Sequence, residues 1–68
     1  MIQVVVARLM ALTNDLNKDV KISAIQALGE GASPSHEIEN RLMQLTNDIN
    51  QDVKIAAIKA LGRLYRRR

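Results

Sequence analysis

The sequence lacks cysteine, tryptophan and phenylalanine, and it contains one tyrosine, one proline and one histidine among 68 residues. Without cysteine the chain has no disulfide bonds and no thiolate metal sites, and the single His36 cannot build a metal site alone. Because aromatic side chains are nearly absent, the core must be aliphatic, and the stacking platforms that bind single-stranded nucleic acid are missing. We therefore expect neither a metal nor a cofactor.

Long apolar runs are also missing, since none approaches the roughly 18 residues of a membrane-spanning helix. The N-terminal segment lacks the basic leader and cleavage site of a signal peptide, so the expected location is the cytoplasm, with no membrane partner. The formal net charge is +3, but four of the ten basic residues lie at the C-terminus, at Arg63, Arg66, Arg67 and Arg68. The rest of the chain is close to neutral, so the basicity belongs to the tail.

Residues 8–29 are written again at residues 41–62, with an offset of 33 residues. The two segments, RLMALTNDLNKDVKISAIQALG and RLMQLTNDINQDVKIAAIKALG, are identical at 17 of 22 positions. This offset falls among the periods at which helix-turn-helix units stack into solenoids. The duplication therefore predicts an all-α fold, a short right-handed α-solenoid with two helix-turn-helix repeats and four helices.

Local signals predict where these helices begin and end. We expect helices over about residues 3–13, from an Asn17 cap to Gly29, over about residues 34–46, and from an Asn50 cap toward residue 65, with Gly62 as a potential early stop. Ser33 is the expected cap of the third helix, with Pro34 at its first position. The predicted single domain, 1–68, has repeat 1 at about 2–30, a linker at about 29–35, repeat 2 at about 34–65 and a basic tail at 66–68.

The second helix of each repeat is apolar over more than one side. The stripe in the first copy consists of Val20, Ala24, Ala27 and Leu28, and Ile22 and Ile25 widen it. Such a helix must be covered by its own partner helix and also by a neighbouring repeat. Val20 and its counterpart Val53 are both expected to be buried at the seam between helices.

The turn into this second helix reads DLNKDVK at residues 15–21 and DINQDVK at residues 48–54, and an alanine-rich stretch ending in Ala-Leu-Gly follows each copy. These segments resemble the HEAT repeat, and more narrowly the short HEAT-like repeats first associated with phycobilisome lyases. The turn proline of that family is absent, and Lys21 and Lys54 stand where the family favours arginine. The resemblance implies a protein-interaction or scaffold module in which Asp15, Asp48 and these two lysines form a structural ladder inside the stack.

No residue is expected to be catalytic. Acidic residues lie at the turns and in the first helical turns, where helix capping and the helix dipole account for them. We therefore expect no enzymatic activity and no small-molecule substrate.

The first helix differs from the third in one informative way. Val4, Ala7 and Ala11 occupy the positions of Glu37, Asn40 and Gln44, so a face that is polar in one copy is apolar in the other. These three residues are interface candidates, with tolerated small residues near a terminus as the alternative. Solenoids generally need three or more repeats, so a homodimer that brings the count to four is favoured among homo-oligomers.

Several interpretations stay open. The favoured function is a non-enzymatic scaffold that associates with itself through an exposed end of its stack, and the chain could also be a fragment of a longer array or an engineered repeat protein. The alternative is a small nucleic-acid-associated protein whose C-terminal arginines, Arg63, Arg66, Arg67 and Arg68, contact phosphates. An accessory subunit resembling the bilin lyases is a third reading.

Overall fold

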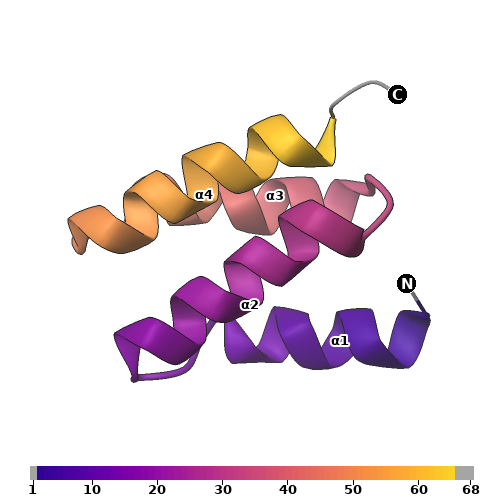
Figure 1. Ribbon diagram of the computed structural model, residues 1–68, viewed down its shortest axis with the longest axis horizontal. Coiled ribbons are helices and arrows are strands. Elements are labelled where there is room, and N and C mark those ends of the chain that lie inside the picture. Colours follow the sequence, from indigo (N-terminus) through magenta and orange to yellow (C-terminus); the bar gives the residue numbers. More distant parts are fainter. Residues whose placement is uncertain (1, 66–68) are drawn as a thin grey trace.

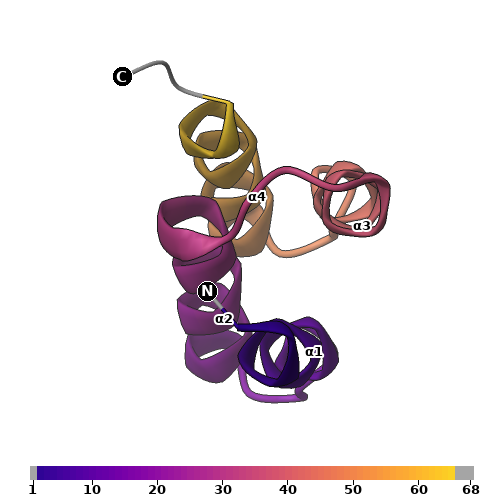
Figure 2. The ribbon, with the colours of Figure 1, turned by 90° about the vertical axis from the view of Figure 1, so that its right-hand side faces the viewer.

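The computed structural model describes residues 2–65 and contains four helices, α1 (Gln3–Leu12), α2 (Lys18–Gly31), α3 (His36–Leu45) and α4 (Gln51–Leu64). Consecutive helices run in opposite directions (Figure 1). In the view along the helices, α2 and α4 lie side by side in one layer, and α1 and α3 form the other (Figure 2). The predicted all-α fold of two helix-turn-helix repeats, α1–α2 and α3–α4, is confirmed.

The second helix of each repeat begins at the predicted asparagine. The side chain of Asn17 accepts hydrogen bonds from the backbone N–H groups of Asp19 and Val20, and Asn50 caps α4 in the same way. These side chains satisfy donors that have no partner inside the helix. Both predicted caps are therefore confirmed.

The third helix begins two residues later than predicted. Ser35, in an extended conformation, accepts a hydrogen bond from the backbone N–H of Ile38 at 3.3 Å, and α3 starts at His36. Ser33 is not the cap, and Pro34 lies outside the helix. Two serines flank the proline, and the one that can reach the free N–H groups of the first turn sets the start.

Gly29 does not end α2, which was the prediction, because the helix continues to Gly31. Gly62 likewise lies within α4. No glycine among the described residues has a positive φ, so neither adopts the left-handed conformation that closes many helices. The linker therefore shrinks to residues 32–35.

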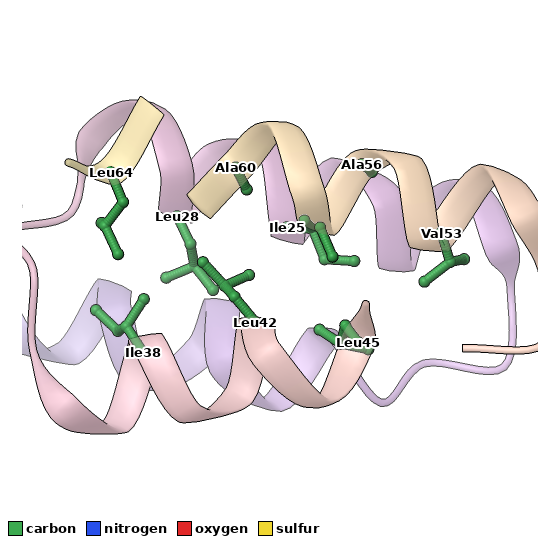
Figure 3. Packing of buried hydrophobic residues seen from close by; sticks show 10 residues of the cluster. Ile25, Leu28, Ile38, Leu42, Leu45, Val53, Ala56, Ala60 and Leu64 are labelled. Atoms are coloured by element: carbon green, nitrogen blue, oxygen red, sulfur yellow. The ribbon is translucent and has the colours of Figure 1, made fainter. Parts of the chain in front are cut away.

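The core is aliphatic and lies between α2, α3 and α4 (Figure 3). The helix α1 contributes no fully buried side chain, although Val6, Leu9 and Met10 pack against the edge of the cluster. The buried hydrophobic residues are Ala24, Ile25, Leu28, Ile38, Leu42, Leu45, Val53, Ala56, Ala57, Ala60 and Leu64. Repeat 2 is thus better covered than repeat 1.

The two seam valines illustrate this asymmetry. Val53 is 1% exposed, as predicted, whereas Val20 is 38% exposed, so the prediction that Val20 is buried is wrong. Repeat 1 covers Val53, but the described chain has no repeat on the other side of Val20. Burial at this position depends on the neighbour and not on the local sequence.

Val53→Asp should unfold the protein, because it buries a carboxylate without a partner at a cost of about 3 kcal/mol or more, and a core of this size supplies only about 3–5 kcal/mol. Val20→Asp should cost below about 1 kcal/mol, since that side chain reaches water. Urea titration followed by circular dichroism at low protein concentration measures both. Equal losses in the two variants would contradict this difference in burial.

Gly29→Ala should destabilise the fold by about 1–3 kcal/mol through overpacking. A Cβ atom at Gly29 would lie 2.8 Å from the Cα atom of Ala60, whereas a Cβ atom at Gly62 would meet nothing within 4 Å. Gly62→Ala is therefore the matched control, and it should stabilise α4 by up to about 1 kcal/mol. Thermal melting of both variants at low concentration tests this, and a harmless Gly29→Ala would contradict the close approach.

Candidate interaction surfaces at the two ends of the stack

The contact between the two repeats shows how this chain packs one unit on the next. The most extensive helix pair is α2 with α4. Ile25 and Leu28 of α2 are completely buried in the cluster that also holds Leu42 and Ala57 of repeat 2. Beside them, the missing side chain of Gly29 lets the backbone of Ala60 come close. Aliphatic side chains from repeat 1 thus cover alanines of repeat 2.

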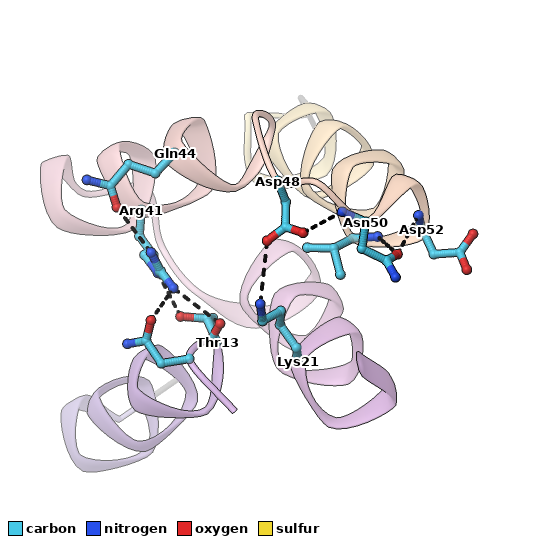
Figure 4. Close-up of polar contacts among 9 residues, drawn as sticks. Thr13, Lys21, Arg41, Gln44, Asp48, Asn50 and Asp52 are labelled. Atoms are coloured by element: carbon cyan, nitrogen blue, oxygen red, sulfur yellow. Dashed lines mark hydrogen bonds and ion pairs between the residues drawn. The ribbon is translucent and has the colours of Figure 1, made fainter. Parts of the chain in front are cut away.

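Arg41 of α3 ties the outer helices together (Figure 4). Its Nε donates to the Thr13 hydroxyl at 2.8 Å, and its Nη2 donates to the Thr13 carbonyl at 3.2 Å and to the Asn14 side-chain oxygen. Its Nη1 donates to Gln44 at 3.1 Å. Thr13 is fully buried, and its hydroxyl also donates to the Met10 carbonyl at 2.6 Å. A guanidinium with several fixed acceptors sets the register between α1 and α3.

A partly buried ion pair joins α2 to the turn between α3 and α4. Lys21 Nζ lies 3.4 Å from Asp48 Oδ2, and Asp48 Oδ1 accepts a hydrogen bond from the Asn50 backbone N–H at 2.8 Å (Figure 4). That backbone N–H lowers the pKa of Asp48 below its usual 3.8, although burial acts in the opposite direction, and the charge of Lys21 lowers it further. An exposed pair, Lys18 with Asp52 at 3.3 Å, lies nearby.

The N-terminal end of the stack carries an apolar groove between α1 and α2. We call it the N-terminal face, and its lining residues are Leu9, Leu12, Asp19, Val20, Ser23, Ala24 and Ala27. The counterparts of these residues, 33 positions later, lie on the side of repeat 2 that packs against repeat 1. Six of the seven counterparts, Leu42, Leu45, Val53, Ala56, Ala57 and Ala60, are buried, and the seventh, Asp52, is exposed.

The C-terminal end exposes an apolar strip of α4, which we call the C-terminal face, formed by Ile55, Ile58, Leu61 and Gly62. Ile58 is 54% exposed, whereas its counterpart Ile25 is completely buried. Ile55 is also exposed, and Leu61 is only partly buried. The two ends of the stack therefore present the positions of its own internal contact, with Val20 and Ile58 exposed where Val53 and Ile25 are buried.

The four predicted ladder residues have separate environments. Lys21 and Asp48 are paired across the repeats. Asp15 accepts a hydrogen bond from the Asn17 backbone N–H at 2.8 Å, but it forms no ion pair with a lysine of residues 2–65. Lys54 is exposed on α4 and forms no ion pair with a described residue. Among residues 2–65, the predicted ladder thus has one ion pair, Lys21 with Asp48, and two members without such a partner, Asp15 and Lys54, which we call half rungs.

The other predicted site residues lie outside this packing. Val4, Ala7 and Ala11 are exposed, and none of them lines the groove of the N-terminal face. Arg63 Nε lies 3.2 Å from Glu30 Oε1 in an exposed ion pair. The remaining arginines of the predicted cluster, residues 66–68, lie outside the described residues.

Sequence reasoning missed Arg41 and its counterpart Arg8. Each is the first residue of a duplicated block, and each precedes the Thr-Asn-Asp turn by five residues. The recurrence was a usable signal, but the acceptors of Arg41 belong to the preceding repeat, and only the packed structure shows them.

Two further findings bear on chemistry. Within residues 2–65, no three acidic or histidine side chains lie close enough together to hold a metal ion. In the same segment no helix has both the length and the apolar character needed to cross a membrane.

Comparison with known proteins agrees with this geometry. The model of HEAT repeats matches residues 6–68, and the chain belongs to the HEAT repeat family. No curated protein and no solved structure gives a significant match. Proteins of this family are typically scaffolds without enzymatic activity and generally mediate protein–protein contacts.

Lys21→Met should raise the pKa of Asp48 toward 3.8 but leave it below that value, because the Asn50 N–H is the larger cause. A depressed carboxyl pKa gives stability that is complete above the unfolded-state value and lost as pH falls through the folded-state value. At neutral pH the variant should lose little stability, since desolvation of Lys21 offsets much of the pairing. NMR titration of the Asp48 carboxyl measures the shift, and an unchanged pKa would show that the pair contributes nothing.

Proposed function

We propose that this HEAT-repeat chain is a non-enzymatic scaffold module that binds protein chains and associates with itself through the exposed ends of its stack. The observation that carries the proposal is the contrast between equivalent residues, above all buried Ile25 and half-exposed Ile58. Burial of an aliphatic side chain contributes about 1.5–3 kcal/mol, so covering these faces is favourable.

The incomplete packing of repeat 1 supports the same proposal. The helix α1 has no fully buried side chain. Any partner that binds only the folded state stabilises it by mass action. Another copy would cover the groove between α1 and α2 that is open in the described residues.

A structural role also accounts for the acidic residues at the turns. Asp15 and Asp48 each accept a hydrogen bond from the backbone N–H of the residue two positions later. Asp48 and Asp52 also form ion pairs with lysines of repeat 1. These contacts stabilise helix starts and join the repeats, which supports a scaffold over a catalyst.

Two surfaces compete for self-association, the ends of the stack and the outer side of α1 with Val4, Ala7 and Ala11. We favour the ends because of the equivalent positions in α3, which hold Glu37, Asn40 and Gln44. Repeat 2 already packs against a neighbouring repeat with these polar residues in place. In that copy the polar residues coexist with stacking, and Gln44 even accepts a hydrogen bond from Arg41.

Light scattering over a range of protein concentrations tests the proposed function. The molar mass should rise above the 7.6 kDa of one chain, the melting temperature should rise with concentration, and high salt should not dissociate the complex. The triple variant Val4→Glu, Ala7→Asn, Ala11→Gln should still associate, whereas its loss of association would place the contact on α1.

A chain that stays monomeric at every concentration would refute self-association. Duplex DNA is the second arm of this experiment. Salt-dependent binding that disappears when Arg66, Arg67 and Arg68 are changed to glutamine would support the nucleic-acid alternative instead.

A further inference from the structure

We propose that copies of this chain associate head to tail, with the C-terminal face of one copy against the N-terminal face of the next, in the geometry by which repeat 1 packs on repeat 2. This inference rests on the proposed self-association and names its two surfaces. The partner is a second copy of the chain, and the internal contact between the repeats is the template.

The apolar parts of the two faces match that template residue by residue. Ile25 and Leu28 are buried in one cluster with the repeat 2 alanines, and Ile58 and Leu61 occupy the same positions on the C-terminal face. On the receiving side, Ala57 and Ala60 correspond to Ala24 and Ala27 in the groove of the N-terminal face. The third alanine of repeat 2, Ala56, corresponds to Ser23 in repeat 1. Serine is also small, so it fits the same space.

Gly62 is the most specific apolar feature. Inside the chain, Gly29 has no room for a side chain because the backbone of Ala60 would lie 2.8 Å from its Cβ atom. Gly62 stands at the equivalent position but has open space beside it, so intrachain packing does not require a glycine there. A glycine inside a helix is otherwise unfavourable. In a head-to-tail pair, Ala27 of a second copy would lie close to Gly62, in the same way that Ala60 lies close to Gly29 inside the chain.

Polar residues repeat the template as well. Arg41 binds the Thr13 hydroxyl and carbonyl and the Asn14 side chain. In a head-to-tail pair, Arg8 of one copy would meet Thr46 and Asn47 of the other. Arg8 is exposed and has no hydrogen bond or ion pair to a described side chain, and Thr46 and Asn47 close α3 as Thr13 and Asn14 close α1.

The half rungs of the ladder are complementary in the same arrangement. Lys21 pairs with Asp48 across the internal contact at 3.4 Å. Lys54 on the C-terminal end and Asp15 on the N-terminal end hold the equivalent positions. One head-to-tail contact would therefore complete a second rung, with opposite charges facing one another.

The contact differs from the template in two places. Gln51 replaces Lys18, so the exposed ion pair of Lys18 with Asp52 has no equivalent between Gln51 and Asp19.

The other place is one corner of the C-terminal end. Glu39 and Tyr65 replace Val6 and Ala32, and the Tyr65 hydroxyl donates a hydrogen bond to Glu39. This corner of the C-terminal end is polar, so the apolar contact is centred on the inner helices, where the template also has its most extensive packing.

A head-to-tail contact joins two different surfaces, so a pair of copies keeps one free N-terminal face and one free C-terminal face. Unlike a two-fold symmetric dimer, such an assembly grows beyond two copies unless it closes into a ring. This difference gives the test.

Two variants, each with one face blocked, separate the arrangements. Ser23→Glu places a carboxylate on the N-terminal face, and Ile58→Glu places one on the C-terminal face; both side chains are exposed in the single chain, so both variants should fold. Each variant alone should associate at least tenfold more weakly than the parent. A 1:1 mixture should form a complex of two chains and nothing larger, with the parent's affinity, because one intact contact remains.

Other outcomes overturn the head-to-tail contact. If either variant alone associates as the parent does, or if the mixture stays monomeric, the contact is not head to tail, although self-association of the parent would still support the proposed function. A monomeric parent would instead refute both. Light scattering and sedimentation velocity distinguish these cases.

Gly62→Ala tests the close approach without adding charge. At low concentration it should melt no earlier than the parent, yet associate at least tenfold more weakly. Lys59→Ala is the matched control on the same helix, because its counterpart Gln26 stays exposed beside the internal contact, and it should associate as the parent does. Parent-like association of Gly62→Ala would refute the proposed packing.

Discussion

The close packing of α2 on α4 is the contact on which the structure depends. The chain has no disulfide and almost no aromatic residues, so its stability must come from aliphatic side chains packed without gaps. Gly29 and Ala60 let the two inner helices approach closely, and Ile25 and Leu28 then become completely buried. The outer helices complete the core from one side, and α3 contributes more than α1 because its side chains pack on α4 of its own repeat and also share the core with α2 of repeat 1.

Polar contacts determine the register of this packing. Arg41 reaches the end of α1, and Lys21 reaches the turn before α4, so each interaction joins one repeat to the next. Surface ion pairs contribute little to stability by themselves, but a guanidinium with several fixed acceptors excludes most other alignments. The apolar contacts thus provide affinity between repeats, and the arginine and lysine contacts provide specificity.

Repetition makes the ends of the molecule chemically similar to its middle. In a protein without repeats, an exposed apolar face has no internal template, whereas here the buried contact shows what the same residues do when they are covered. The family assignment accounts for a role in protein contacts. The contrast between Ile25 and Ile58 shows which apolar side chains are exposed. The positions of Arg8 and Lys54 are the basis for the orientation in the proposed head-to-tail contact.

The sequence by itself determined the features that neighbouring residues control. The duplicated block, its 33-residue offset and the asparagine caps predicted four helices in two repeats, because capping and helical periodicity act within a turn or two of chain. The start of α3 was missed by two residues because two nearby serines offered the same local signal.

Only the tertiary structure decided which residues are buried or paired when their local sequences are the same. Gly29 looked like a helix end but is a packing position, and Val20 and Val53 lie in nearly identical segments yet differ in burial. Lys21 has its carboxylate and Lys54 does not. The reason is that burial and ion pairing depend on whether another repeat packs alongside. The local sequence does not specify which segment packs against it.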